Sequence, residues 1–259
     1  MSRTVQSHLH KGILTLTLSR ANTYNSFNRE MSLALIEALH QAKKNDEVRV
    51  IVLTGGGKAF CAGQDLREVT DDNGIGFEQI LNEHYNPIVR AIRSMPKPVV
   101  AAVNGVAAGA GANIAFACDL TIAKESASFT QAFSKIGLVP DSGGSFFLPR
   151  LVGMQRATAL TFLSDRISAQ EAADMGLIYQ CVADEDYQEA VEKLAAQLAK
   201  MPTRALGMTK QLLNDSLTNS LEEQLELEGE MQLAASKKHD YKEGVKAFLE
   251  KRKPKFLGK

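Results

Sequence analysis

The chain has 259 residues, enough for one large domain or for a core with a smaller appendage. Hydrophobic residues make up 44% and charged residues 23%, and 30 Lys and Arg residues balance 30 Asp and Glu residues. A net charge of zero argues against bulk nucleic-acid binding and against a polybasic membrane surface. Three scattered cysteines, no signal-peptide core and no run of membrane-spanning length lead us to expect a cytoplasmic protein without nucleic-acid or membrane partners.

Strands and helices are predicted to alternate through the first half of the chain. Residues 12–20 alternate between apolar and polar, as a half-buried strand does. Asn28 can cap a helix over 29–44 that carries one apolar stripe. Buried strands are predicted over 48–57 and 96–105, and a helix over 77–94. A further strand with its edge is predicted over 120–130.

Helical periodicity dominates the chain after Gly153. The alternation before this point favours an α/β fold with a stacked core and outer helices. We therefore predict a core over residues 1–195 and a helical C-terminal region over residues 196–259.

Several common binding motifs fail on inspection. The glycine-rich segment 54–59 suggests a phosphate cradle, but Lys58 is followed by Ala59 and Phe60 where a P-loop needs Ser or Thr. The glycines at 105, 109 and 111 miss the dinucleotide-binding spacing. There is no HExxH motif and no cluster of Cys and His, so no metal site is predicted.

The tetrapeptide Asp-Ser-Gly-Gly at 141–144 also surrounds the nucleophilic serine of many serine proteases. A catalytic triad needs a His base that the fold brings to the Ser. None of the five His residues stands in a supporting motif, and GxSxG is absent. A nucleophilic Ser142 is therefore disfavoured.

Two loops rich in small residues, 59–66 and 104–113, each follow a predicted buried strand and open towards a helix. Such places leave backbone N–H groups unpaired. Two of these groups aimed at one point would form an oxyanion hole for a polarised carbonyl. The alternative is that the glycines and alanines only permit close packing of helix on strand.

Asp141 admits two interpretations as well. Pro-Asp-Ser-Gly is a favourable turn sequence, and Asp before a helix is a good N-cap. The carboxylate is also flanked by apolar residues, and partial burial there would raise its pKa towards that of a useful base.

Three segments together, 57–66, 97–120 and 133–153, resemble the signature blocks of the crotonase (enoyl-CoA hydratase/isomerase) superfamily, in the order found in that family. The resemblance runs from about Val5 to the C-terminus. It implies a crotonase-like core of stacked ββα units and enzymes that act on acyl-CoA thioesters.

The resemblance also implies roles for individual residues. Backbone N–H groups of Gln64 and Ala110 would form the oxyanion hole, and Asp141 would be the catalytic base. Substrate and CoA contacts would come from the loops before and within the first block, from the second and third blocks, and from a C-terminal helix near the chain end: Tyr24, Ser26, Ala62, Gly63, Gln64, Asp65, Leu66, Gly109, Phe133, Phe256 and Lys259.

The departures from the family pattern narrow the chemistry. Hydratases of the family use two glutamates to activate water, and these fall at Asn113 and Phe133 in this chain. Neither residue can act as a carboxylate base. Asp141 stands where certain isomerases of the family carry an acidic residue. The resemblance therefore implies isomerisation by one carboxylate, without water.

Within the family the chain looks most like the enzymes that isomerise ring-1,2-epoxyphenylacetyl-CoA to oxepin-CoA in phenylacetate degradation. Phe133, Phe146 and Phe147 could line a pocket for a planar ring, although phenylalanines are more often plain core. Two alternatives stay open: a Δ3,Δ2-enoyl-CoA isomerase of fatty-acid oxidation, which would use the same residues, and a catalytically silent acyl-CoA-binding subunit.

The resemblance implies further expectations about assembly and cofactors. The family forms trimers, often paired into hexamers, through the helical C-terminal region, so a homo-trimer or hexamer is expected. No metal or redox cofactor is implied, because coenzyme A arrives as part of the substrate.

Overall fold

The computed structural model describes residues 4–70 and 74–259. The first three residues of the N-terminal stretch considered above lie outside these ranges. A six-stranded sheet forms the base, with its strands in the order β1-β2-β3-β5-β7-β10. Strands β1 (Val5–His10) and β2 (Ile13–Leu18) are antiparallel, and the later pairs are parallel: β3 (Val50–Gly55), β5 (Val99–Val103), β7 (Leu120–Lys124) and β10 (Gln180–Val182).

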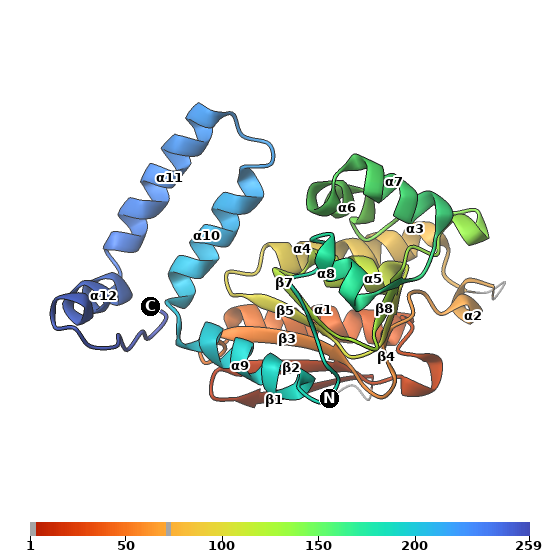
Figure 1. Cartoon of the computed structure of the whole chain (residues 1–259), viewed down its shortest axis with the longest axis horizontal. Helices are drawn as coiled ribbons and strands as arrows, with labels where there is room; N and C mark the ends of the chain where they lie inside the picture. Colours follow the sequence, from red (N-terminus) through yellow and green to blue (C-terminus); the bar gives the residue numbers. More distant parts are fainter. Residues whose placement is uncertain (1–3, 71–73) are drawn as a thin grey trace.

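A second sheet of short strands stands beside the first. Its order is β4 (Ala59–Cys61), β6 (Val106–Ala108), β8 (Ser128–Thr130) and β9 (Ile167–Ser168). The chain repeatedly adds one strand to the first sheet, one to the second, and then a helix. The predicted core of stacked ββα units is thereby confirmed (Figure 1).

The central strands are buried on both faces, which explains their β-branched sequences. Val50, Val52 and Val100 pack against α9 (Tyr187–Lys200) on one face. Ile51 and Leu53 point to the opposite face, towards α1 (Arg29–Lys44) and α4 (Asn86–Arg93). Helix α1 follows its prediction closely, since the Asn28 side chain accepts a hydrogen bond from the Met31 N–H at 3.0 Å.

The predicted helix over 77–94 forms with an irregularity. It begins as α3 (Phe77–Ile80), passes through one π-helical turn, η2 (Leu81–Tyr85), and continues as α4. The small-residue loop over 104–113 contains β6 and the first residues of α5 (Ala110–Ala117). The remaining short elements are η1 (Ala21–Thr23), α2 (Leu66–Val69), η3 (Ser134–Ile136), α6 (Gly144–Val152), α7 (Met154–Leu163) and α8 (Ala169–Asp174).

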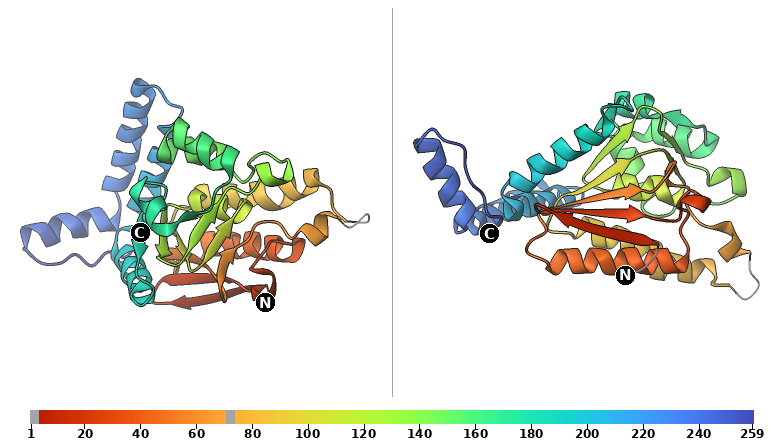
Figure 2. Two further views of the ribbon diagram at one scale, coloured as in Figure 1. Left: turned by 45° about the vertical axis from the view of Figure 1, so that its right-hand side comes forward. Right: turned by 90° about the horizontal axis from the view of Figure 1, so that it is seen from below.

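Three C-terminal helices extend away from the sheets: α10 (Thr203–Asp215), α11 (Leu221–Ser236) and α12 (His239–Leu249) (Figures 1 and 2). The predicted division between residues 195 and 196 falls within α9, and the division itself stays a prediction. Within the described residues, no helix is both long and apolar enough to cross a membrane.

Candidate active site

Two loops are joined edge to edge at one end of the sheets. The Ala62 N–H donates to the Tyr24 carbonyl at 3.0 Å, and the Phe27 N–H donates to the Gly63 carbonyl at 2.7 Å. The Asp65 N–H donates in turn to the Phe27 carbonyl at 2.8 Å. Because the Gly63 carbonyl points at Phe27, the trans peptide directs the Gln64 N–H the opposite way.

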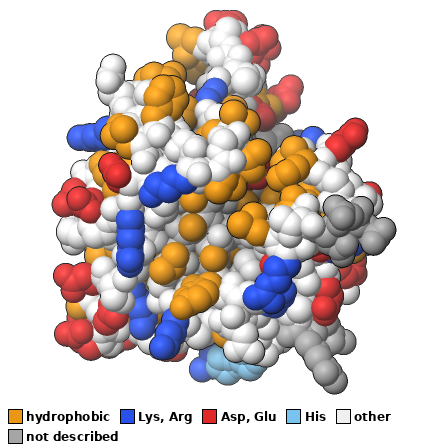
Figure 3. All heavy atoms as spheres, turned by 90° about the vertical axis from the view of Figure 1, so that its right-hand side faces the viewer, with side chains coloured by type: hydrophobic (Ala, Val, Ile, Leu, Met, Phe, Trp, Pro, Cys, Tyr) orange, Lys and Arg blue, Asp and Glu red, His pale blue; other side chains and the backbone are white. Residues whose placement is uncertain are grey.

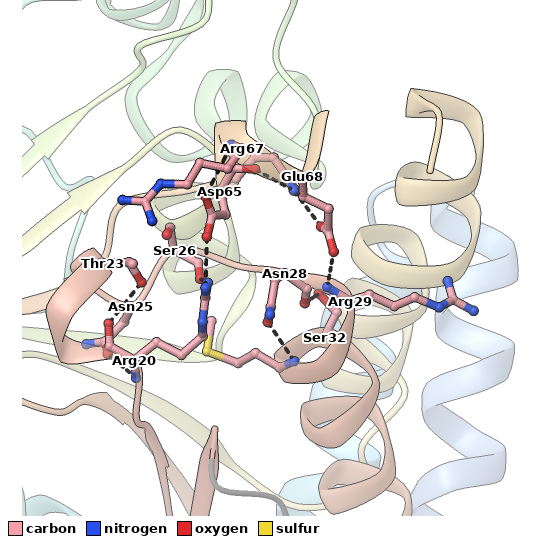
Figure 4. Close-up of polar contacts among 12 residues, drawn as sticks. Arg20, Thr23, Asn25, Ser26, Asn28, Arg29, Ser32, Asp65, Arg67 and Glu68 are labelled. Atoms are coloured by element: carbon pink, nitrogen blue, oxygen red, sulfur yellow. Dashed lines mark hydrogen bonds and ion pairs between the residues drawn. The ribbon is translucent and has the colours of Figure 1, made fainter. Parts of the chain in front are cut away.

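Ion pairing stiffens the same loops (Figure 4). Arg20 binds the Asp65 carboxylate at 2.8 Å and also donates to the Ser26 carbonyl. Burial alone would raise the pKa of Asp65, but the hydrogen bonds from Arg20 and from the Arg67 N–H outweigh burial and lower the pKa. The Asp65 side chain is thus committed to holding the loop and capping α2.

The second loop meets the first where β6 passes into α5. Gly109 has a positive φ of 51° and donates its N–H to the Thr130 carbonyl at 2.9 Å. A Cβ atom on Gly63 would lie 3.0 Å from the Ala108 carbonyl oxygen and 3.6 Å from the Ala110 nitrogen. The loops that carry Gln64 and Ala110 are therefore in contact.

The backbone N–H groups of Gln64 and Ala110 differ from those of their neighbours in hydrogen bonding. The N–H groups of Ala62, Asp65 and Gly109 all donate to backbone carbonyls. Within residues 4–70 and 74–259, no acceptor takes the N–H of Gln64 or of Ala110. Two unpaired donors on touching loops are the arrangement that an oxyanion hole requires.

Asp141 sits in a tight turn before α6. Ser142 and Gly143 both have positive φ, at 50° and 76°, and the Ser142 hydroxyl donates to Asp141 Oδ1 at 2.9 Å. Burial raises the pKa of the Asp141 carboxyl to about 6, although the Ser142 hydroxyl opposes the rise. The Asp141 side chain does not cap α6, whose N-cap is Gly143. The turn therefore presents a half-buried carboxylate with a raised pKa.

Asn113 links this turn to the oxyanion loop. It lies on α5, three residues after Ala110, and its side-chain amide donates to the Asp141 carbonyl at 2.9 Å. Phe133 is buried, and its Cζ would lie 3.7 Å from a Cβ atom on Gly109. The two positions at which the resemblance implies the glutamates of hydratases are therefore filled by a buried amide and a buried ring.

The sequence patterns missed a buried polar group behind the first loop. The Tyr85 hydroxyl donates to Gln64 Oε1 at 2.6 Å, and Gln64 Nε2 donates to the Glu68 carboxylate at 2.9 Å. Burial raises the pKa of Tyr85, and the negative charge of Asp141 raises it further. Tyr85 belongs to an apolar helical pattern, and only the π turn places its hydroxyl against Gln64, so no sequence signal announces this contact.

The remaining predicted contact residues lie around these loops or away from them. Ser26 is buried, whereas Tyr24 and Leu66 are exposed beside the joined loops. Hydrophobic side chains gather over the middle of the molecular face on this side, with Lys and Arg around them (Figure 3). Phe146 and Phe147 line a different cleft of about 660 Å³, between α4, α6 and α10, and are covered by Arg150 and Arg93.

The chain end differs from its prediction. Helix α12 ends at Leu249, so Phe256 and Lys259 lie in a non-helical tail. The Asp240 carboxylate accepts hydrogen bonds from the N–H groups of Leu257 and Gly258, both at 2.7 Å, and folds the tail back. Phe256 and Lys259 there line a cleft of about 480 Å³ with α10, α11 and α12.

A nucleophilic Ser142 gains no support from the structure. The Ser142 hydroxyl is buried and bonded to Asp141 rather than to a histidine. In the described part of the chain, no three His, Cys, Asp or Glu residues are grouped as metal ligands.

Comparisons with known proteins show which family the chain belongs to. The model of the enoyl-CoA hydratase/isomerase family matches residues 8–259. The chain is 47% identical to the 1,2-epoxyphenylacetyl-CoA isomerase of Escherichia coli strain K12, over the whole of both chains. It is 46% identical to a Rhodobacter capsulatus protein named "Probable enoyl-CoA hydratase", over 99% of this chain and 98% of that one.

A solved structure shares the fold as well. The enoyl-CoA hydratase from Polaromonas sp. JS666 superposes with a TM-score of 0.91 at 36% identity, covering 97% of this chain and 99% of that one. With the sequence blocks, the stacked sheets and the paired loops in place, the chain belongs to the enoyl-CoA hydratase/isomerase family.

Proposed function

We propose that the protein is an acyl-CoA isomerase that uses Asp141 as its single base and the N–H groups of Gln64 and Ala110 as its oxyanion hole. The observation that carries the proposal is the state of the three positions that could hold a carboxylate. Asp141 has a carboxyl whose pKa of about 6 suits a base, while Asn113 and Phe133 cannot ionise.

The proposed reaction moves one proton and creates no net charge. The ionised Asp141 takes the proton on the carbon beside the thioester carbonyl, and the electrons of that C–H bond move towards the carbonyl oxygen. The two N–H groups stabilise the resulting enolate. Charge then passes into the conjugated acyl group, and Asp141 returns its proton to a more distant carbon.

We propose ring-1,2-epoxyphenylacetyl-CoA as the substrate and oxepin-CoA as the product. With this substrate the C–C bond between the two epoxide carbons breaks as the ring double bonds shift, so that the oxygen enters a seven-membered ring, and the proton that left the α-carbon returns to a ring carbon. The 47% identity to the E. coli 1,2-epoxyphenylacetyl-CoA isomerase supports this choice. The same proton transfer would also shift a Δ3 double bond to Δ2 in a linear enoyl-CoA. Phe133, buried beside Gly109, would contact the acyl group.

Coenzyme A enters this scheme as part of the substrate, without a separate cofactor. Backbone around Ala62 to Leu66 and the side chains of Tyr24 and Ser26 would hold it near the thioester. Phe256 and Lys259 would contact the CoA of a neighbouring copy, in a trimer or hexamer. An aromatic face and an ammonium group suit an adenine and a phosphate, respectively.

The test is the substitution Asp141→Asn, which keeps the shape of the side chain and removes its basicity. We expect the isomerisation rate with ring-1,2-epoxyphenylacetyl-CoA and with linear 3-enoyl-CoA to fall at least about 100-fold. Wild-type kcat/KM should fall about tenfold per pH unit below pH 6, because Asp141 must be ionised to accept a proton.

Ser142→Ala is the matched control, since it alters the next residue and spares the carboxylate. It should retain more than about a tenth of the wild-type rate. Its acidic limb should move to higher pH, because the Ser142 hydroxyl lowers the Asp141 pKa. Wild-type activity in Asp141→Asn, or rapid hydration of crotonyl-CoA by the wild type, would contradict the proposal.

A further inference from the structure

The turn that carries Asp141 is closed locally by the Gly144 N–H, which donates to the Asp141 carbonyl at 2.8 Å. Residues Ile136 to Val139, which precede it, are exposed. Ser142 adopts the left-handed region that non-glycine residues avoid, followed by Gly143 in the same region. Such backbone persists only where the surrounding structure holds it in place. A tertiary contact must therefore fix the Asp141 turn.

The Asn113 side chain supplies this contact. Asn113 is completely buried, and its Nδ2 donates to the Asp141 carbonyl at 2.9 Å, beside the Gly144 N–H, which donates to the same oxygen at 2.8 Å. Gly144 rests directly on the amide, since a Cβ atom there would lie 2.3 Å from Asn113 Nδ2. The amide thus contacts both sides of the strained residues.

The orientation of the Asn113 amide is itself fixed. A carbonyl oxygen can only accept, so the Asn113 atom that faces Asp141 must be nitrogen. Asn113 Oδ1 then faces Gln131, whose Nε2 donates to it at 2.8 Å. Gln131 is anchored through its carbonyl, which accepts from the Ser164 hydroxyl at 2.6 Å. The Asp141 carbonyl thus fixes the orientation of the Asn113 amide, and the Asn113 amide fixes the orientation of the Gln131 amide.

This polarity leaves one acceptor unsatisfied. Gln131 Oε1 is buried and has no hydrogen-bond partner among the described residues. A buried polar atom without a hydrogen-bond partner destabilises the fold. If the Gln131 amide were turned, its Oε1 would face Asn113 Oδ1. To avoid two facing oxygens the Asn113 amide would also have to turn, and its oxygen would then face the Asp141 carbonyl. The observed arrangement therefore keeps the hydrogen bond from Asn113 Nδ2 to the Asp141 carbonyl and leaves Gln131 Oε1 without a partner among the described residues.

We propose that Asn113 and Gln131 form a pair of positioning residues that fixes the Asp141 turn and thereby the place from which the carboxylate reaches the acyl group. Neither residue touches substrate in this proposal, which rests on the function proposed above. Because Asn113 also lies on α5 three residues after Ala110, the pair ties the base to the same helix as one oxyanion donor.

The experiment measures proton abstraction directly. The probe is phenylacetyl-CoA in D₂O, whose α-protons exchange when a base removes them, followed by proton NMR. Asn113→Leu removes the donor at similar volume, and we expect kcat for exchange to fall about 10- to 100-fold with KM within about threefold, as for a displaced base. Asn113→Ala serves if the leucine variant does not fold, with the same expected result.

Ser164→Ala is the matched control. The substitution removes the hydrogen bond to the Gln131 carbonyl. It leaves the side-chain contacts from Gln131 to Asn113 and from Asn113 to Asp141 in place. We expect a lower melting temperature and an exchange rate within about threefold of the wild type. Equal exchange rates in the Asn113 and Ser164 variants would overturn the positioning role.

Two further arms separate this inference from the proposed function. The wild type should exchange the α-protons of phenylacetyl-CoA, and Asp141→Asn should not. Failure of either arm refutes the proposed base. Success of both, with wild-type exchange in Asn113→Leu, refutes only the positioning pair.

Discussion

At the scale of single residues, the role proposed for Asp141 as a base conflicts with the stability of the fold. Its carboxyl is held in a turn with two consecutive positive φ angles, and burial raises its pKa from an ordinary 3.8 to about 6. A raised pKa means that the folded protein binds the proton more tightly than the unfolded chain does. The ionised form that a base needs is therefore the form that weakens the fold at neutral pH.

Asp141→Asn should consequently stabilise the protein at pH 7.5. The two pKa values imply that ionised Asp141 costs about 2 kcal/mol at this pH, after a reduction for the water that reaches a half-buried group. The melting temperature of Asp141→Asn should rise about 5 °C above wild type at fixed protein concentration.

The gain should depend on pH in one direction. The penalty is complete above pH 6, shrinks as the folded carboxyl binds its proton, and vanishes below about 3.8. Calorimetry at pH 7.5 and pH 4 checks this. An equal gain at both pH values would show that strain in the turn, rather than ionisation, limits stability.

At the scale of elements, the parts that formed as predicted are those whose side chains carry the information. The helix over 29–44 has an Asn cap and a stripe of Met31, Leu35 and Leu39, all of which are buried. Strand β3 is β-branched because both of its faces are covered. In these elements, hydrophobic periodicity and burial coincide.

The features that escaped prediction depend on partners far along the chain. The π turn that directs Tyr85 at Gln64 has no local signature, and neither has the Asn113 amide bond to Asp141. The resemblance predicts a C-terminal helix near Phe256, but the Asp240 carboxylate accepts hydrogen bonds from two N–H groups of the tail, and the tail folds back as a loop. Candidate site residues were identifiable by resemblance, whereas the contacts that orient them appear only in three dimensions.

A buried ion pair contributes to the packing of helix α10 against the core. Lys210 Nζ donates to the Ile92 carbonyl at 2.6 Å and binds the Asp119 carboxylate at 2.8 Å, and Asp119 also accepts from the Val99 N–H. Removing Lys210 leaves the carboxylate with Arg93, 3.5 Å away. Lys210→Met should therefore lower the free energy of unfolding by about 2 kcal/mol, less than for a fully isolated charge.

Urea unfolding measures this loss, with Arg204→Met as the control on the same helix. Arg204 pairs with Asp46 at 3.6 Å, but both side chains are exposed, so its loss should cost less than about 0.5 kcal/mol. Similar losses in the two variants would mean that the Lys210 pair does not fasten α10.

At the scale of the whole molecule, the C-terminal helices present apolar side chains to solvent. Leu221 and Leu233 on α11 and Phe248 and Leu249 on α12 are each at least 65% exposed. Large exposed apolar surfaces mark sites where another protein packs. The helices also lie away from the two sheets, which leaves these side chains free to meet a second copy (Figure 2).

If these helices form the proposed trimer, Phe248→Glu should shift the protein towards monomers in light scattering coupled to size-exclusion chromatography, because a carboxylate would have to be buried between copies. Leu33→Glu, on α1, places the same charge at another exposed apolar position and should leave the mass unchanged.

The proposed contact of Phe256 and Lys259 with a neighbouring CoA adds a kinetic consequence. The Phe248→Glu monomer should show a raised KM for acyl-CoA with a smaller change in kcat, since Asp141, Gln64 and Ala110 all belong to one chain. A wild-type protein that is monomeric, or a monomeric variant with unchanged KM, would contradict the shared site.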